Sequence, residues 1–390
     1  MIQLKSLANS PERILKSQEW DWMLGTDTVP YVTSDVVTIS EATAEIYYEG
    51  GSELTEMFRS AAKQVIDQHL FREMGIPDSL IEMIQYTWSD ERHVHLYGRF
   101  DLSFDEEGNH VKLIEYNADT ATCLPETAIV QWAQLKSNGL DEDRQYNTLY
   151  EELVERFQLI KTLNDDLSPS IVFSTLRNYP EDESNVSILM EAAREAGFDV
   201  VFAYIDELDF SPTDGMFIHD PDNAAFIRFD FWFKLIPWEF IGNEEKELAE
   251  ILTQLIKNRQ LVVLNPAYSL LYQSKYILKV LWDLYPYHPL LLQTERHQIP
   301  HKKSVAKVLF GREGANISII EKGGDVSEAV NGDYGDQPRI YQEFFPFQTD
   351  QEGLTYQAGL FVVNEPCALG FRRGGTILDN SAQFVGHVIE

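Results

Sequence analysis

The sequence predicts a mixed α/β and α+β fold, and three features of the chain support this class. In the middle of the chain, "SPSIVFSTL" (168–176) and "SNVSILMEAAREAGFDVVFAYIDEL" (184–208) predict strand, helix and strand, with a glycine at the helix end. The last third changes to short β-rich runs separated by glycine turns. An earlier stretch, residues 96–119, predicts a β-hairpin. We therefore expect a parallel layer and antiparallel strands in one chain.

The composition is that of a folded protein without an internal divider. Of 390 residues, 44% are hydrophobic and 24% are charged, which is close to the average of globular chains. No repeat, low-complexity tract or linker rich in Pro, Gly and Ser separates the predicted layers. We therefore expect the whole chain, residues 1–390, to pack as a single unit.

The charge balance argues against two classes of partner. The 63 Asp and Glu residues against 31 Lys and Arg give a formal charge of -32, whereas nucleic acids and anionic membranes both reward clustered cations. A cationic substrate fits this balance, although acidity also serves solubility. We expect no nucleic-acid partner and no membrane partner.

The cysteines and the N-terminus indicate a cytoplasmic protein. Cys123 and Cys367 are too few and too far apart in sequence for a disulfide framework. The N-terminus lacks the apolar core of a signal peptide, and no stretch approaches the roughly 18 apolar residues of a membrane span.

Helix and strand signals follow in order along the chain. Apolar residues at helical spacing predict helices over 53–72, 125–135 and 268–285. A buried strand is predicted within 224–240, and a helix followed by a strand within 243–265. Short strands with glycine turns are predicted within 304–326, 339–347 and 355–375.

The predicted hairpin carries a candidate metal site. Side chains alternate faces along a strand, so Arg99 and Asp101 share one face, and Glu115 shares a face with Asn117. With "DEEGN" (105–109) as the turn, Asp101 lies opposite Glu115, and two such carboxylates repel unless a cation lies between them. Asp, Glu and Asn oxygens suit Mg²⁺, which keeps its remaining positions for water and phosphate. Arg99 would point at the same phosphates. The alternative is an exposed hairpin face with ordinary polar alternation.

Two lysines and two histidines give weaker signals. Lys307 precedes a glycine loop whose N–H groups can approach phosphates, but a surface lysine before a hairpin turn has the same pattern. Lys275 lies on a predicted helix and would ordinarily occupy its solvated face. His93 and His95 alternate on a predicted strand without a third zinc ligand, so we interpret them as structural. No phosphate-loop motif, dinucleotide fingerprint or nucleophile elbow occurs.

Seven segments, taken in order, carry a resemblance to a known family. They are "YGRFDLSFDEEGNHVKLIEYNADTATCLPETAIVQW", "EDESNVSILMEAAREAGF", "FKLIPWEF", "SKYILKVLWDLYPYHPLLL", "KVLFGREGANI", "IYQEFFPF" and "LGFRRGG". From about residue 20 to the C-terminus, the chain resembles the synthetase half of glutathionylspermidine synthase and its stand-alone relatives. The resemblance implies an ATP-grasp fold, circularly permuted, with the metal ligands before the nucleotide-binding lysines.

The resemblance also implies roles for individual residues. It implies Mg²⁺ ligands at Asp101, Glu115 and Asn117. It implies catalytic arginines at Arg99 and Arg372, with Arg373 an alternative to Arg372 from spacing. Contacts to ATP are implied for Arg99, Asp101, Lys275, Lys307, Glu313, Gly314, Gln342, Glu343, Phe344 and Phe345. Within this set, Glu313 and Gly314 belong to a flexible loop, and 342–345 form the adenine hinge.

On the substrate side the chain departs from the family pattern. Thr120 and Thr122 keep hydroxyls near the implied substrate site, while the family's "NADTPTSL" stands here as "NADTATCL". The family's "EDxGT" stands here as "EDESN". Its acidic run, Glu181, Asp182 and Glu183, is the local candidate for holding ammonium groups. The alternative for this run is a solvated loop.

The implied organisation is one glutathionylspermidine synthase-like unit in three parts. Residues 1–150 supply helices and the metal-binding hairpin, 151–265 an α/β layer on the substrate side, and 266–390 the lysines, loop, hinge and closing strands.

The implied function is an ATP-dependent carboxylate–amine ligase with ATP and Mg²⁺ as cofactors and small molecules as partners. It would form an amide through an acyl phosphate, from a glutathione-like peptide and a polyamine-like amine. The chain begins too late to contain an amidase half, so no amide hydrolysis is expected. The alternative is a non-catalytic relative that binds nucleotide or a partner protein, although each implied ion and phosphate ligand is present in the sequence.

Overall fold

The fold is described from a computed structural model. It describes residues 2–17, 20, 30–104, 111–220, 225–332, 334–335, 337–379 and 381–390. The hairpin turn predicted at 105–109 lies outside these residues.

An antiparallel sheet occupies the centre of the molecule and joins the early hairpin to the end of the chain. Its strand order is β20-β19-β18-β3-β4, and β17 pairs with the free part of β18. The strands are β3 (Gly98–Phe104), β4 (Val111–Asn117), β17 (Gln348–Thr349), β18 (Thr355–Val362), β19 (Pro366–Gly374) and β20 (Gln383–Val385). Residues more than 250 positions apart are thereby neighbours, as in the pair Asp101 and Gly359.

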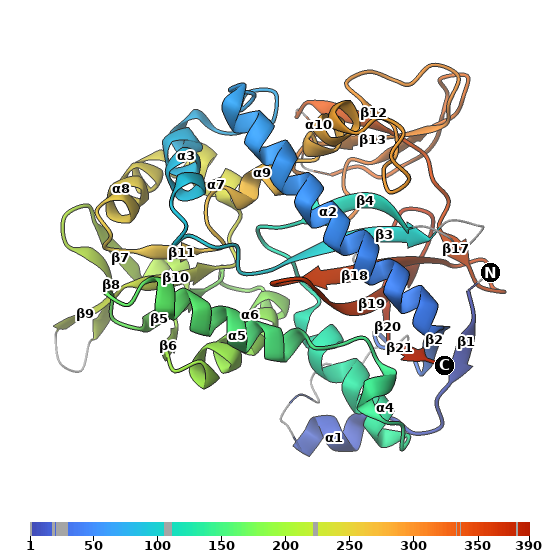
Figure 1. Ribbon diagram of the computed structural model, residues 1–390, viewed down its shortest axis with the longest axis horizontal. Coiled ribbons are helices and arrows are strands. Elements are labelled where there is room, and N and C mark those ends of the chain that lie inside the picture. Colours follow the sequence, from blue (N-terminus) through green and yellow to red (C-terminus); the bar gives the residue numbers. More distant parts are fainter. Residues whose placement is uncertain are drawn as a thin grey trace.

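One long helix, α2 (Glu41–Asp67), crosses this sheet (Figure 1). Phe58 packs on Phe100 and Tyr116, with ring centroids 5.4 and 5.0 Å apart. The helix begins twelve residues before the predicted range of 53–72, where the Ser40 side chain accepts a hydrogen bond from the Thr43 backbone N–H. Position 51 of the helix requires glycine, because a Cβ there would lie 2.5 Å from the Leu360 side chain. The helix therefore covers one face of the sheet and leaves the other face for the site.

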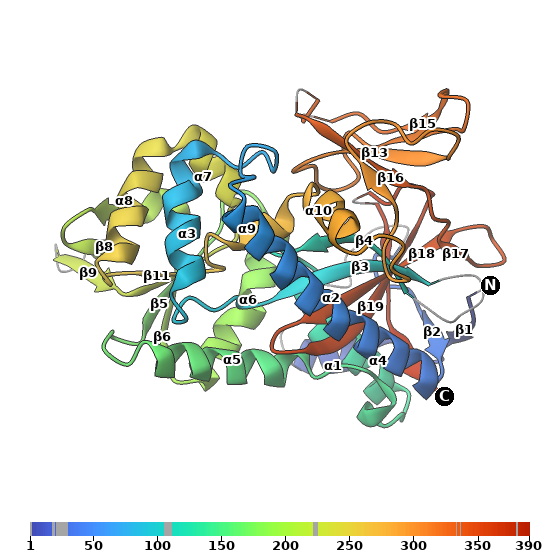
Figure 2. The same cartoon turned by 45° about the horizontal axis from the view of Figure 1, so that its top comes forward.

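The predicted parallel layer is present, with the strand order β11-β10-β5-β6. Alternate residues of β10 face opposite sides: Phe231 and Phe233 pack with α5 and α6, while Trp232 packs with α8. The strands are β5 (Ser170–Ser174), β6 (Asp199–Phe202), β10 (Phe231–Lys234) and β11 (Val262–Leu264). The helices around it are α3 (Ile81–Ser89), α5 (Leu149–Leu163), α6 (Pro180–Glu195), α7 (Trp238–Glu244) and α8 (Lys246–Lys257), and Figure 2 shows them on both faces.

The single buried strand predicted within 224–240 is wrong in part. Residues Ala225–Phe229 form β9, which is mostly exposed and pairs with β8 (Gly215–Asp220) and β7 (Leu208–Ser211) in a separate meander. Asp230 follows, and only β10 enters the parallel layer. The continuous apolar run concealed this change of sheet because β9 exposes Phe226 to 61% and buries only Phe229, at its end.

The second antiparallel sheet has the order β12-β16-β13-β14-β15 and stands apart from the parallel layer (Figure 2). Its strands are β12 (Thr294–Glu295), β13 (Ser304–Val308), β14 (Ser318–Ile320), β15 (Val326–Ala329) and β16 (Arg339–Glu343). The helix predicted over 268–285 is broken into α9 (Ser269–Gln273) and α10 (Ile277–Leu284). Ser274 is extended at the break, and the Lys275 backbone N–H donates to Leu309 O at 2.9 Å.

The two ends of the chain meet in a small sheet with the order β1-β2-β21, shown at the N and C labels of Figure 1. Its strands are β1 (Leu4–Ser6), β2 (Asp35–Ile39) and β21 (His387–Ile389), and α1 (Glu12–Ser17) lies between the first two. The helix predicted over 125–135 is confirmed as a π-helical turn, Glu126–Val130, that continues into α4 (Gln131–Ser137). None of the helices in the described ranges is long and apolar enough to cross a membrane.

Candidate active site

The site begins with the register of the β3–β4 hairpin, which agrees with the predicted pairing. Asp101 pairs with Glu115 and Arg99 with Asn117. The register then shifts between Asp101 and Leu102, which leaves Ile114 as a bulge. The Ile114 carbonyl accepts a hydrogen bond from Lys307 Nζ at 3.1 Å. The bulge therefore connects the hairpin to the second antiparallel sheet.

The polar side chains of the hairpin are paired, and they are buried in β3 and half-buried in β4, so the exposed-face alternative is wrong. Arg99 Nε donates to Asp101 Oδ1 at 2.7 Å, and Asp101 is 3% exposed. Asn117 Nδ2 donates to Asp101 Oδ2 at 3.1 Å. Glu115 lies 3.2 Å from Lys275 Nζ. The Asp101 carboxylate thus contacts Arg99 and the Asn117 amide. The Glu115 carboxylate, paired with Asp101 in the register, faces Lys275.

Two buried lysines face this hairpin. Lys275 Nζ donates to Gly311 O at 2.8 Å, and Lys307 Nζ donates to Gln342 Oε1 at 2.9 Å. Each lysine is at most 5% exposed, so the surface alternatives for both are wrong. Burial lowers the pKa of Lys307 to about 8, against the attraction of Glu115. Burial raises the pKa of Glu115, but the charges of Lys275 and Lys307 outweigh it and the pKa lies below its ordinary value.

A pocket opens beside the two lysines, and residues 311–315 form one wall of it. Glu313 and Gly314 have positive φ values of 56° and 71°. Gly314 approaches the backbone so closely that a Cβ there would lie 2.6 Å from Leu378 O. Both implied loop residues therefore line the same pocket as the lysines.

The implied hinge lies at the end of β16. The buried Gln342 side chain bridges Lys307 and the hairpin, because its Nε2 donates to Leu113 O at 3.2 Å. Glu343 pairs with Lys302 at 2.9 Å, and Phe344 lies under Lys303, whose Nζ is 4.4 Å from the ring centroid. Phe345 follows and is half-buried.

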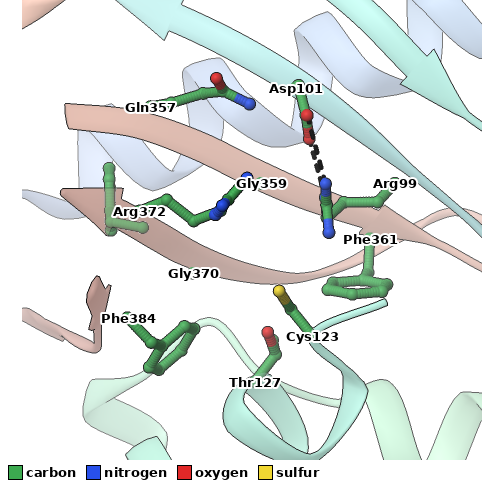
Figure 3. Close-up of a pocket in the computed structure, with 11 residues that line it drawn as sticks. Arg99, Asp101, Cys123, Thr127, Gln357, Gly359, Phe361, Gly370, Arg372 and Phe384 are labelled. Carbon is green, nitrogen blue, oxygen red and sulfur yellow. Dashed lines mark hydrogen bonds and ion pairs between the residues drawn. The ribbon is translucent and has the colours of Figure 1, made fainter. Parts of the chain in front are cut away.

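A second pocket lies on the face of the central sheet away from α2 (Figure 3). Its polar groups include Arg99, Asp101 and Arg372, and Figure 3 shows the two guanidinium groups pointing toward one another. Gly359 makes room for Arg99, since a Cβ there would lie 2.9 Å from Arg99 Cδ. Arg372 pairs with Gln357 on β18 and lines this pocket.

Arg373, the alternative from spacing, points elsewhere. Successive side chains of a strand alternate faces, so Arg373 leaves the pocket that Arg372 lines. Its guanidinium pairs with Asp350 at 2.7 Å and with Glu352 at 2.7 Å. The structure therefore places Arg372, and not Arg373, opposite Arg99.

The implied substrate residues lie next to this pocket. Arg99 Nη1 donates to Thr122 O at 2.8 Å, and the hydroxyl-bearing residues Thr120 and Thr122 are half-buried. Asn185 of α6 accepts from the Leu124 backbone N–H at 3.1 Å. This contact brings the first turn of α6 beside the Thr120–Leu124 segment.

The acidic run of the sequence forms that first turn, so a solvated loop is the wrong structure for it. Glu181 is exposed, and Glu183 accepts a hydrogen bond from the Tyr204 hydroxyl at 2.9 Å. Burial and the neighbouring Glu181 raise the pKa of Asp182 to about 6. Asp182 is thus the partly buried member of the three.

A fully buried ion pair behind the site was missed by sequence reasoning. Lys234 Nζ lies 3.0 Å from Asp119 Oδ1, and both side chains are 0% exposed. The other carboxylate oxygen accepts from the Trp238 backbone N–H at 2.8 Å. The available signal was a lysine at the end of the apolar run "FWF", which predicts a buried strand. A lysine is almost never fully buried unless it is paired, so this position required a buried acidic partner.

His93 and His95 lie before β3 and not on a strand as predicted. Burial lowers the pKa of each to about 4, and His95 Nε2 lies 2.6 Å from Ala118 O. Within the described residues, His, Cys, Asp and Glu side chains form no group of three that could hold a metal. The hairpin set differs because an asparagine supplies its third oxygen.

Comparison with a solved structure gives the class of fold. A glutathione synthetase-like effector from Globodera pallida, in its apo form, matches 98% of this chain and 98% of its own length, with a TM-score of 0.57 and 11% identity. The chain therefore has a mixed α/β, glutathione synthetase-like fold.

Sequence comparison gives the family. The glutathionylspermidine synthase preATP-grasp family matches residues 3–390, and the chain belongs to this family of ATP-dependent acid–amine ligases. A Haemophilus influenzae protein with the provisional name acid–amine ligase is 32% identical over 78% of this chain and 77% of its own. The bifunctional glutathionylspermidine synthetase/amidase of Escherichia coli is 24% identical over 89% of this chain, and trypanothione synthetase of Crithidia fasciculata 26% identical over 84%. The chain spans 57% and 51% of the lengths of these two relatives.

Proposed function

We propose that the chain is an ATP-dependent ligase that joins the carboxylate of a small, glutathione-like peptide to a polyamine-like amine through an acyl phosphate. The observation that carries this proposal is that Arg99, Asp101 and Arg372 line one pocket. Glu115, on the other strand of the same hairpin, lines the pocket that contains the two lysines. Phosphoryl transfer to a carboxylate needs positioning and positive charge more than it needs a covalent protein group.

On the nucleotide side, Lys275 and Lys307 would bind the phosphates, and 342–345 would border the adenine. Asp101, Glu115 and Asn117 fit Mg²⁺, because they offer oxygen donors from adjacent paired strands beside cationic side chains. These residues would hold the ion, which would supply positive charge against the negative charge that develops on the transferred phosphoryl group.

On the acid side, Arg99 and Arg372 would orient the carboxylate and stabilise the transferred phosphoryl group. Arg99 holds both Asp101 and the Thr122 carbonyl, so its guanidinium is fixed before substrate arrives. The amine would then attack the acyl carbon and displace phosphate.

On the amine side, the first turn of α6 favours a cationic nucleophile. Glu181 and Asp182 belong to the helix whose Asn185 accepts from the Leu124 backbone, two residues after Thr122, and Glu183 is held by its contact with Tyr204. The names of the E. coli and C. fasciculata relatives support glutathione and spermidine as the first substrates to test.

Three further expectations belong to the same proposal. Residues 1–390 work as one unit, without amidase activity. The chain acts in the cytoplasm. It is a circular permutant of the ATP-grasp fold. The pairing of the early strand β3 with the late strand β18 supports the permutation. The lysines, the two arginines and the oxygen-bearing hairpin residues named in the proposal line two pockets or the hairpin between them, which supports catalysis over the non-catalytic alternative.

The test is the initial rate of ADP release from MgATP with a panel of thiol peptides and amines, with the amide identified by mass spectrometry. We expect release that requires both an acid and an amine, with glutathione and spermidine among the active pairs. The Arg372→Ala variant is the negative control. Absence of amine-stimulated release for every pair would contradict the proposal.

A further inference from the structure

One buried ion pair ties the loop of residues 311–316 to the parallel layer. Arg312 Nη1 donates to Glu239 Oε1 at 2.5 Å, and the Glu239 side chain is 3% exposed. Arg312 belongs to the wall of the lysine pocket, whereas Glu239 lies on α7, directly after β10. The contact therefore joins the second antiparallel sheet to a layer on the other side of the pocket.

The pair is incompletely satisfied in the part of the chain that the structure describes. Arg312 Nη2 and Glu239 Oε2 are both buried without a hydrogen-bond partner there. A bidentate pair would use both oxygens and would be more stable. Burial lowers the pKa of Arg312, but the Glu239 carboxylate outweighs it and the guanidinium stays charged. Leaving such atoms unpaired costs free energy, so stability alone does not account for the arrangement.

Glu239 is held rigidly with respect to the catalytic hairpin. The preceding residue, Trp238, donates its backbone N–H to Asp119 at 2.8 Å and its indole N–H to Asn265 O at 3.0 Å. Asp119 follows the implied metal ligand Asn117 by two residues. A fixed path of contacts thus leads from the hairpin to the carboxylate that receives Arg312.

The backbone of the loop takes a conformation that its contacts must hold. Glu313, Gly314 and Asn316 all have positive φ values, a backbone conformation that most residues avoid. Asn316 anchors the far end, because its side chain bonds the backbone of Gly332 and Tyr334. At the near end, Lys275 Nζ donates to Gly311 O at 2.8 Å, and the Arg312 side chain adds the contact to Glu239.

We propose that Glu239 is a positioning residue that holds the 311–316 loop over the nucleotide pocket through Arg312. The inference rests on the proposed function in taking a nucleotide as the ligand of this pocket. Glu239 contacts no implied substrate or nucleotide atom itself. It acts by fixing the loop that closes the pocket.

The first test is steady-state kinetics of the Glu239→Gln variant in the ADP-release assay. We expect the KM for ATP to rise about tenfold, which corresponds to about 1.4 kcal/mol, with a smaller change in kcat. The double variant Glu239→Gln with Arg312→Gln should have the same KM for ATP as Arg312→Gln alone, because both changes break the same pair. Glu321→Gln is the matched control. It breaks a different ion pair of the same sheet, the pair with Lys303, which is more exposed. Additive effects, or an unchanged KM, would overturn the inference.

The second test does not need turnover. Trypsin cleaves after Arg312 only when the loop opens, and the fragment that starts at Glu313 identifies this cut by mass. We expect Glu239→Gln to be cut faster than wild type without nucleotide, with MgADP slowing the cut in both proteins. Equal cleavage in both proteins would count against the role of Glu239. If Glu239→Gln does not fold, Glu239→Asp, which keeps the charge and shortens the side chain, is measured in the same two assays with the same expected directions. Failure of ADP release with every acid and amine would reject the proposed function and leave the cleavage result to decide the role of Glu239.

Discussion

At the scale of single residues, burial decides which cations of the site are permanent charges. Despite burial, the charge of Asp101 raises the pKa of the Arg99 guanidinium, so Arg99 stays charged. Lys307 differs because burial lowers its pKa to about 8. The phosphate pocket therefore contains a charge that can be titrated near neutral pH.

Lys307 should make nucleotide affinity depend on pH. The charged form attracts phosphate, so ATP affinity should fall as pH rises through about 8, where the free protein loses this proton. Lys307→Arg should remove the step, since its guanidinium stays charged. Calorimetric titration with MgADP between pH 7 and pH 9.5 measures both proteins. The same fall in the Arg variant would assign the titration to another group.

Arg372 and its neighbour provide a matched pair. Arg372→Ala should lower kcat about 100- to 1000-fold while ATP affinity changes little, because the guanidinium acts on charge that develops in the transition state. Arg373→Ala should leave kcat near its starting value, since Arg373 pairs with Asp350 and Glu352 away from the pocket. Initial rates at saturating ATP separate the two. A larger loss at Arg373 would mean that the site has been assigned to the wrong arginine.

At the scale of elements, the hairpin could be predicted from sequence and the lysine supports could not. Alternation with a period of two fixes which side chains share a face, and the turn then brings Asp101 opposite Glu115. Lys275 was placed on a continuous helix because the apolar period continues through 268–285, whereas a backbone bond from Lys275 to Leu309 breaks it. That bond comes from the turn directly after β13, more than thirty residues later, so no local pattern contains it.

The first turn of α6 should determine the affinity for a cationic amine. Glu181→Gln with Asp182→Asn should raise the KM for spermidine and leave the KM for ATP nearly unchanged, because the phosphate ligands lie elsewhere. In wild type, the KM for spermidine should rise with salt, and also as pH falls through about 6, where Asp182 gains a proton. Glu191→Gln, on the same helix and paired with Arg194, is the control. Equal behaviour of the control and the double variant would place the amine elsewhere.

At the scale of the whole molecule, three layers meet behind the site. Asp119 follows the hairpin, Lys234 ends a strand of the parallel layer, and Ser269 of α9 lies 3.4 Å from the same carboxylate. Contacts between such distant segments are set by the packing of the layers. The sequence therefore indicated the residues that carry chemistry and missed those that join the layers.

Breaking this junction should cost stability more than any surface ion pair. Lys234→Met leaves Asp119 buried without its cation, so the free energy of unfolding should fall by about 3–5 kcal/mol. Adding Asp119→Asn should recover part of that loss. Lys63→Met, which removes an exposed pair with Asp67, should change it by less than about 1 kcal/mol. Urea unfolding measures all three, and equal losses for Lys234→Met and Lys63→Met would show that the buried pair does not hold the layers together.

The transfer of ¹⁸O from the carboxylates of labelled glutathione to inorganic phosphate, with spermidine and MgATP, tests the central claim most directly. An acyl phosphate keeps one carboxylate oxygen on phosphorus when the amine displaces phosphate. We therefore expect one ¹⁸O atom in the phosphate for each amide formed, with the rate of transfer by Arg372→Ala lowered in proportion to its kcat. Amide formation with unlabelled phosphate, or no amide from this pair, would contradict the account.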